Sequence, residues 1–204
     1  MVCASLGDVV LRIDSSLPVG IHHLELVGCP SKPADIAGLP VTHVDETRIE
    51  DLATRPGVTA SNAAPHASLS THGSTQLNVG LEVIGVDHVV VLANDVRATC
   101  AEIERASGAP LRRVKEGERG IQGFHRWGSV ILEVVERRLV APDDASMVAT
   151  YWGFVIVVAD LAAVTRRLGP DVIGAPRPAV QAGRQIATVR SGAGLGVPLA
   201  LMSD

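Results

Sequence analysis

From about Leu81 to the end of the chain, hydrophobic runs alternate with short polar or glycine-bearing segments. The first run, Val86 to Ala93, is unbroken and rich in valine, which predicts a strand buried on both faces. Asp95 then predicts the N-cap of a helix, because apolar side chains follow at helical spacing until Gly108 stops it. Further strands are predicted at residues 111–115, 122–127 and 129–136. The predicted order of elements is therefore β-α-β-β-β.

The same order is predicted a second time. Asp95 and Asp160 are 65 positions apart, and each closes an apolar strand. The second set comprises a strand at 154–158, a helix at 162–168, and strands beginning at 179, 185 and 197. A near-constant offset of this kind indicates a duplicated supersecondary unit. We therefore predict an α+β fold in which two modules, at about residues 84–139 and 150–203, form a cupped mixed β-sheet.

The first 80 residues differ in character. Residues 53–74 are rich in Ser, Thr and Ala with little periodicity, and Pro30, Pro33 and Pro40 punctuate another stretch, so both read as irregular. Residues 6–14 and 20–28 are exceptions that predict strands, and residues 6–14 also resemble the last strand of the first repeat. We expect an irregular N-terminal extension (residues 1–80), either a degenerate partial module or a chance similarity, that adds strands or covers one opening of a main domain (residues 81–204).

Composition narrows the class of protein. Apolar residues make up 47% and aromatic residues 2%, so the core must consist mainly of Val, Leu, Ile and Ala. The net charge of −4 and the lack of a long basic run argue against nucleic-acid binding. No apolar stretch approaches the roughly 18 residues needed to span a bilayer, so we expect no membrane partner. Three scattered cysteines, Cys3, Cys29 and Cys100, indicate free thiols and a cytoplasmic location.

Two polar residues interrupt the strands of the first repeat. His88 follows Asp87 at the start of a valine-rich strand, and Glu133 lies within another strand. Alternation places Glu133 on one face with Ile131 and Val135. If that face is buried, the carboxylate costs several kcal/mol unless it is paired with a cation or protonated; otherwise Glu133 faces solvent on an edge strand. The second repeat has Gly153 and Ala200 at the two matching positions, and neither offers a side-chain donor.

Several segments together resemble the vicinal oxygen chelate superfamily, which includes glyoxalase I, methylmalonyl-CoA epimerase, extradiol dioxygenases and the bleomycin- and fosfomycin-resistance proteins. These segments are residues 85–91, 121–124, 128–135, 183–188 and 194–202. Within the superfamily the chain looks most like the glyoxalase-like proteins of actinobacteria. The resemblance covers about residues 81 to 202, and it implies the fold more strongly than any one activity.

In metal-dependent members of that superfamily, each module offers one ligand from its first strand and one from its last. The resemblance thus implies that His88 and Glu133 are ligands of a divalent metal ion. Two protein ligands are fewer than the three that a catalytic ion normally has. Another donor could come from His125, from upstream histidines, or from the second chain of a homodimer; alternatively, the site is metal-free. The upstream histidines are His22, His23 and His43.

Other residues are candidates for roles around this pair. Without a metal ion, Glu133 is a candidate general base and His125 its acid/base partner, provided that alternation turns His125 and not Arg126 inward. Gln122 and Arg184 are candidates for binding oxygen atoms of a ligand, and Trp127 is one of few aromatic residues available for stacking. The basic pairs at 112–113 and 137–138 stand next to acidic residues, which predicts solvated surfaces.

Three functions follow as hypotheses. The leading one is a glyoxalase-like enzyme of lyase, isomerase or dioxygenase type that acts on a small oxygenated metabolite, with a divalent metal. The alternative is a metal-free protein that binds small molecules or sequesters an antibiotic in the same cup. The third is a structural protein whose cup is filled.

Overall fold

A computed structural model of the chain describes residues 2–6, 9–13, 16–22, 24–27, 34–44, 82–118 and 120–204. These residues belong to two compact units. One contains residues 88–153 together with the described residues between 20 and 44, and the other contains residues 154–204 together with the described residues before 20 and between 82 and 87. The segment 53–74, predicted to be irregular, lies outside the described residues, as do His23 and Cys29.

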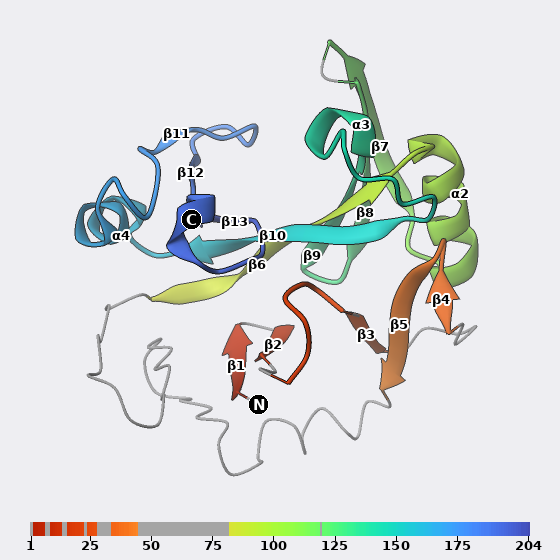
Figure 1. The fold of residues 1–204 in the computed structure, drawn as a ribbon, viewed down its shortest axis with the longest axis horizontal. Helices are drawn as coiled ribbons and strands as arrows, with labels where there is room; N and C mark the ends of the chain where they lie inside the picture. Colours follow the sequence, from red (N-terminus) through yellow and green to blue (C-terminus); the bar gives the residue numbers. More distant parts are fainter. Residues whose placement is uncertain are drawn as a thin grey trace. The chain divides into compact units, whose positions relative to one another are not determined.

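Module 1 has the predicted β-α-β-β-β order (Figure 1). Strand β9 lies between β6 and β8, parallel to β6 and antiparallel to β8, and β7 pairs with β8. The predicted helix signals are confirmed: the Asp95 side chain accepts a hydrogen bond from the Ala98 amide at 2.9 Å, and Gly108 ends the helix with φ of 72°. The elements are β6 (Val83–Ala93), α2 (Val96–Ser107), β7 (Leu111–Gly117), β8 (Gly120–Trp127) and β9 (Val130–Glu136).

Helix α2 packs against one face of the module 1 strands, here called the helix face. It approaches closely at Gly123, where a Cβ atom would overlap the Cys100 sulfur. Cross-strand pairs show which strand residues share this face, because directly paired side chains point the same way. The helix face carries the pairs Val89–Leu132 and Val91–Val134, all four buried. Alternate residues on the same strands form the opposite, non-helix face.

Module 2 repeats this topology. Strand β13 is parallel to β10 and antiparallel to β12, which in turn pairs with β11. The Asp160 side chain caps the helix by accepting from the Ala163 amide at 2.8 Å. Its elements are β10 (Thr150–Val158), α4 (Leu161–Leu168), β11 (Arg177–Pro178), β12 (Gln185–Thr188), a 3₁₀ turn (Ser191–Ala193) and β13 (Leu199–Ser203). The predicted α+β fold of two β-α-β-β-β modules with mixed strand pairing is confirmed.

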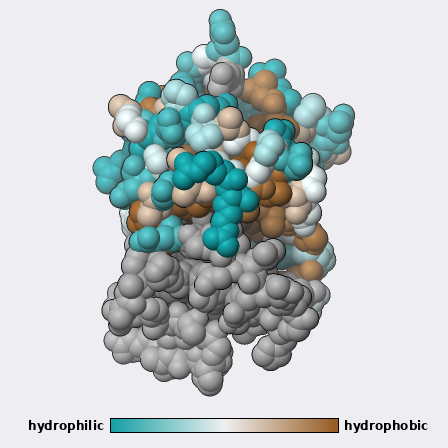
Figure 2. Space-filling model, turned by 90° about the vertical axis from the view of Figure 1, so that its left-hand side faces the viewer, coloured by the Kyte–Doolittle hydropathy of each residue, from teal (hydrophilic) through white to brown (hydrophobic). Residues whose placement is uncertain are grey.

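Helix α4 buries Leu161 and Val164 and exposes Arg166 and Arg167. The side of the molecule that carries α4 in Figure 1 is drawn space-filled in Figure 2, where hydrophilic residues prevail and hydrophobic residues show in smaller patches between them. No helix in the described part of the chain is long and apolar enough to cross a membrane.

The N-terminal residues contain more strands than predicted. Strands β1 (Val2–Leu6) and β2 (Val9–Ile13) pair antiparallel, and β3 (Leu24–Val27) runs parallel to β5 (Leu39–Val44). The strands predicted within residues 6–14 and 20–28 are therefore confirmed. The irregular structure predicted around Pro40 is wrong, because β4 (Asp35–Ile36) and β5 form a hairpin there.

This β4–β5 hairpin packs against module 1. Ile36 and Leu39 are both fully buried, and β4 lies beside α2 (Figure 1). The Tyr151 hydroxyl, from the first residues of β10, donates to the Pro40 carbonyl at 3.0 Å. Burial raises the pKa of Tyr151, and a backbone hydrogen bond to Leu24 opposes that rise only in part. The hydroxyl therefore remains protonated and keeps its hydrogen bond.

Arg137 begins the short helix α3 (Arg137–Val140) after β9 and is only 2% exposed. All five guanidinium hydrogens have acceptors. The five acceptors are the Asn94 side chain (3.1 Å), the Thr150 hydroxyl (3.0 Å), the Leu92 and Val148 carbonyls (3.1 and 2.6 Å), and the Asp144 carboxylate. The solvated position predicted for Arg137 is therefore wrong, whereas its neighbour Arg138 is 77% exposed as predicted.

Candidate functional site

Three of the predicted site residues meet on the non-helix face of module 1. Glu133 pairs across the strands with Val90 of β6 and Phe124 of β8. Its two diagonal neighbours hold the carboxylate: Gln122 Nε2 donates to Oε1 at 2.9 Å, and His88 Nε2 lies 3.5 Å from Oε2. Both carboxylate oxygens therefore have a polar neighbour in a fixed position.

The His88–Glu133 pair is neither fully buried nor fully solvated. The side chain of His88 is 15% exposed and that of Glu133 is 16% exposed. Both groups therefore keep some contact with solvent, while most of the surrounding water is excluded. Electrostatic interactions and hydrogen bonds are stronger in such a setting than on an open surface.

Apolar side chains lie next to this polar group. Val90, Leu92 and Val135 form a buried cluster, against which Trp152 and Ala141 pack. Val90 is the cross-strand partner of Glu133, and Leu92 is the partner of Val135, so the cluster belongs to the non-helix face. A ligand at Glu133 would thus find a carboxylate beside packed apolar side chains, of which the partly exposed Trp152 is one.

His125 and Trp127 do not join this group. They alternate with Gln122 and Phe124 along β8 and therefore lie on the helix face. His125 is 1% exposed, and its Nδ1 bonds to the Ala109 carbonyl at 3.0 Å. Burial lowers the pKa of His125, while that hydrogen bond and the charge of Glu104 oppose the fall. Trp127 Nε1 donates to the Ser107 hydroxyl at 3.2 Å.

Arg184 lies in module 2 and is engaged by carboxylates of its own chain. Its Nη1 donates to Asp87 at 2.8 Å and its Nη2 to Asp204 at 3.4 Å. Gln181 donates to the other oxygen of Asp87 at 3.3 Å. The predicted role of Arg184 in binding a ligand carboxylate would require it to leave these partners.

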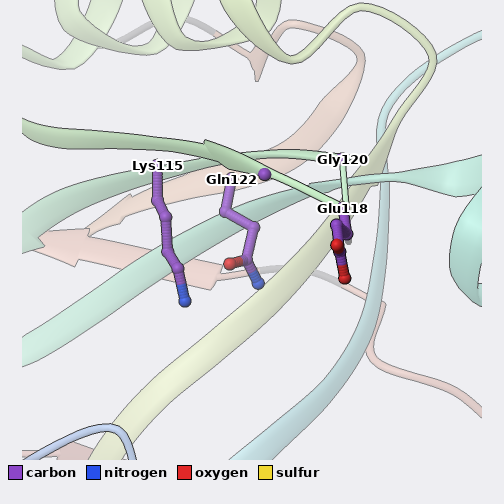
Figure 3. Close-up of a pocket in the computed structure, with 5 residues that line it drawn as sticks. Lys115, Glu118, Gly120 and Gln122 are labelled. Carbon is purple, nitrogen blue, oxygen red and sulfur yellow. The ribbon is translucent and has the colours of Figure 1, made fainter.

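The residues that sequence reasoning missed are on β7. Arg113 pairs with Phe124 and Lys115 with Gln122, so both cations share the face of Glu133. Lys115 and Gln122 also line a pocket of about 230 Å³ (Figure 3). Its remaining lining comes from the β7–β8 turn, at Gly117, Glu118 and Gly120.

The donors around Glu133 do not match a catalytic divalent ion. No group of three His, Cys, Asp or Glu side chains suited to a metal occurs among the described residues. His88 and Glu133 supply two donors, whereas Gly153 and Ala200 add none. His43 lies on β5 of the N-terminal sheet, and His22 is exposed just before β3. The expectation that His125 supplies a further metal ligand is not supported, because its side chain lies on the opposite face.

This chain resembles known proteins in structure and not in sequence. No family model and no curated protein matches the sequence. A methylmalonyl-CoA epimerase from Mycobacterium tuberculosis matches with a TM-score of 0.50 at 18% identity, over 59% of this chain and 88% of that one. A Streptomyces coelicolor methylmalonyl-CoA epimerase in complex with 2-nitronate-propionyl-CoA gives 0.47 at 17% identity, over 58% and 96%. A hypothetical protein from Bacillus halodurans gives 0.49 at 12% identity, over 58% and 93%. The likeness to the first of these structures establishes the fold and, at 18% identity, not the activity. The chain has the fold of the vicinal oxygen chelate superfamily.

Proposed function

We propose that this protein binds a small oxygenated metabolite on the non-helix face of module 1 and catalyses an isomerase-type proton transfer through Glu133. The observation that carries this proposal is the arrangement of the Glu133 carboxylate, with Gln122 Nε2 at 2.9 Å and His88 Nε2 at 3.5 Å. A carboxylate held by an amide and adjoining an imidazole is suited to act as a general base, because its two oxygens are oriented in a defined direction.

Each of the three residues has a separate role. Glu133 Oε2 takes a proton from a carbon atom next to a carbonyl group of the ligand, and the electron pair left on that carbon spreads into the carbonyl. Gln122 holds Oε1 and so orients the carboxylate. His88 lies beside Oε2 and exchanges the proton with it, so that the proton can return to the ligand from another position. The protons and electrons balance without a co-reactant.

A divalent metal ion at this site remains a prediction from the family resemblance. The proton transfer proposed for Glu133 uses protein side chains alone. Elemental analysis of protein purified without chelator or affinity tag would test for a metal ion, beside a His88→Ala, Glu133→Ala double variant. We expect well below one equivalent of metal in both proteins. A near-stoichiometric metal that the double variant loses would mean that further donors complete the site.

Proton transfer can be tested without knowing the substrate. We would incubate the protein in D₂O with a panel of small 2-oxo and 2-substituted carbonyl compounds and follow carbon-bound deuterium by NMR. Loss of a general base typically lowers a rate by about 10²- to 10⁴-fold, so Glu133→Gln should lose exchange by at least about 100-fold. Glu102→Gln, on α2 and therefore on the far side of the strands from Glu133, is the matched control and should keep it. Equal exchange in wild type and Glu133→Gln would exclude the proposed role of Glu133.

A second candidate, a metal-free binding protein, is favoured by the apolar cluster of Val90, Leu92 and Val135 with Trp152 packed against it. Such a surface can hold the hydrophobic part of a ligand without any reaction. This candidate predicts that ligands raise the thermal stability of both wild type and Glu133→Gln while no compound in the panel exchanges its protons.

A further inference from the structure

The β7 side of the non-helix face carries two positively charged side chains, those of Arg113 and Lys115. Arg113 and Lys115 form no ion pair with any other described residue. Glu116, between them and the turn, points to the helix face and pairs with Arg97 of α2. The net charge of the chain is −4, and one carboxylate, that of Glu118, lines the pocket together with Lys115.

The same edge of the sheet offers hydrogen-bond donors beside these cations. The side chains of Lys115 and Gln122 extend to the same side of the β7–β8 hairpin, and Glu118 lies toward the turn beside Gly120 (Figure 3). Gln122 uses one amide hydrogen for Glu133, which leaves its second hydrogen for a ligand. Ammonium, guanidinium and amide donors together are the groups that bind carboxylates and phosphates.

The pocket is suited to one group of a ligand and not to a whole ligand. Its volume of about 230 Å³ is below the roughly 300 to 1,000 Å³ of ordinary ligand sites. Neighbouring strands lie about 4.8 Å apart, so β7 is about 10 Å from β9, the strand of Glu133. A molecule anchored at Lys115 would therefore extend over Gln122 and Phe124 to reach the carboxylate.

We propose that Arg113 and Lys115 form a subsite for an anionic group, a carboxylate or a phosphate ester, on the ligand that Glu133 acts upon. The position of the reacting carbon at Glu133 rests on the proposed function, whereas the anion preference rests on the two cations alone. The remainder of the ligand lies against Trp152 and the apolar cluster. Neutral metabolites of the same length bind more weakly because they leave both cations unpaired.

Three probes that share a similar apolar chain but differ in their polar group separate the effect of charge from that of hydrophobic contact. These probes are octanoate, octyl phosphate and 1-octanol. We would measure their affinities by isothermal titration calorimetry in low salt. At least one anionic probe should bind about 10-fold or more tightly than 1-octanol, which corresponds to about 1.4 kcal/mol. The stronger of the two anions identifies the subsite as one for carboxylate or for phosphate.

The variants assign the preference to the subsite. Arg113→Gln with Lys115→Gln should lose the anion preference while its affinity for 1-octanol stays unchanged, which also shows that the face is intact. Arg105→Gln removes an exposed cation from α2 and should keep the preference. Equal affinity for all three probes, absence of binding by any of them, or an undiminished preference in the double variant would each overturn the proposal. Glu133→Gln should retain the anion preference, so a failure of proton exchange and a failure of this subsite give different results.

Discussion

Arg137 shows how one buried side chain holds several segments of module 1. Its guanidinium joins β6 through the Leu92 carbonyl, the β10 strand through Thr150, and the segment between the modules through Asp144 and Val148. Lysine would keep the charge but supply three donors in place of five. The backbone carbonyls would then lack partners, at about 1–3 kcal/mol for each buried group.

We therefore expect Arg137→Lys to lower the free energy of unfolding by about 1–3 kcal/mol, as measured by urea denaturation. Arg138→Gln is the matched control on the next, largely exposed residue and should change stability by less than about 0.5 kcal/mol. Equal effects of the two substitutions would show that the guanidinium network contributes nothing.

His125 predicts a pH dependence of stability. Burial lowers its pKa in the folded protein, so the unfolded chain takes up a proton at a higher pH than the folded chain does. The contribution of His125 to the free energy of unfolding should therefore be fully present above the unfolded pKa of about 6.5. It should be lost as the pH decreases through that value toward the lowered folded pKa. Urea denaturation at pH 7.5 and 5.0 should show a smaller loss for His125→Gln than for wild type. An identical loss would assign the pH dependence to other groups.

Among individual residues, the sequence was enough to identify those whose chemistry is unusual for their position. Glu133 interrupts an apolar strand, and alternation was enough to place it with Ile131 and Val135 on one face. Alternation could not decide whether His125 or Arg126 turns inward, because only the position of α2 settles which face is covered. Arg137 and Arg138 look alike in the sequence, and their different burial depends on where the next segment returns.

Among the elements, the contact between α2 and β8 depends on a glycine. A methyl group at Gly123 would overlap the Cys100 sulfur, so the helix could not lie as close to the strand. Burial, and to a smaller extent the charge of Glu104, raises the pKa of Cys100 to about 11, so this thiol acts as a small apolar side chain.

We expect Gly123→Ala to cost about 1–3 kcal/mol of stability through overpacking. Adding Cys100→Ala should restore part of that loss, because it removes the sulfur that the new methyl group meets. Gly117→Ala is the control, since a Cβ atom there would contact nothing within 4 Å. Thermal denaturation of wild type, both single variants (Gly123→Ala and Cys100→Ala), the double variant and the control would measure the coupling. Purely additive effects would contradict the proposed contact.

The sequence predicted the elements that have strong local signals. Asp95 caps its helix as predicted, and the apolar runs form strands. Asp160, which was predicted only to close a strand, caps the matching helix. The β4–β5 hairpin was missed because its turn places Ala37, a non-glycine residue, at φ of 56° ahead of Gly38. The face on which Lys115 lies could also not be predicted, because a register shift between Leu111 and Arg113 breaks simple alternation along β7.

For the molecule as a whole, the N-terminal hairpin should be part of the cooperative unit of module 1. Ile36 is fully buried, and truncating such a residue to alanine typically costs about 2–5 kcal/mol. Ile36→Ala should also speed hydrogen exchange in α2, which β4 contacts. Ile84→Ala, at a 40% exposed position of β6, should do neither. Unchanged exchange in α2 would show that the hairpin folds independently.

The two modules share a topology but differ in chemistry. The pair Val155–Ala200 in module 2 occupies the place of Val90–Glu133 in module 1. Duplication was visible in the sequence because the offset between the repeats is nearly constant. The homodimer and the cytoplasmic location remain predictions, and light scattering of the purified protein would test the first.

The two tryptophans of the chain have different surroundings. Trp127 lies on the helix face of module 1 and donates to Ser107, whereas Trp152, on β10, packs against the apolar cluster beside Glu133. Intrinsic fluorescence therefore contains two separate reporters. Emission from Trp152 should shift when a ligand displaces water from the non-helix face, while emission from Trp127 should follow only the packing of α2. A Trp127→Phe protein would be a label-free optical sensor of ligand binding.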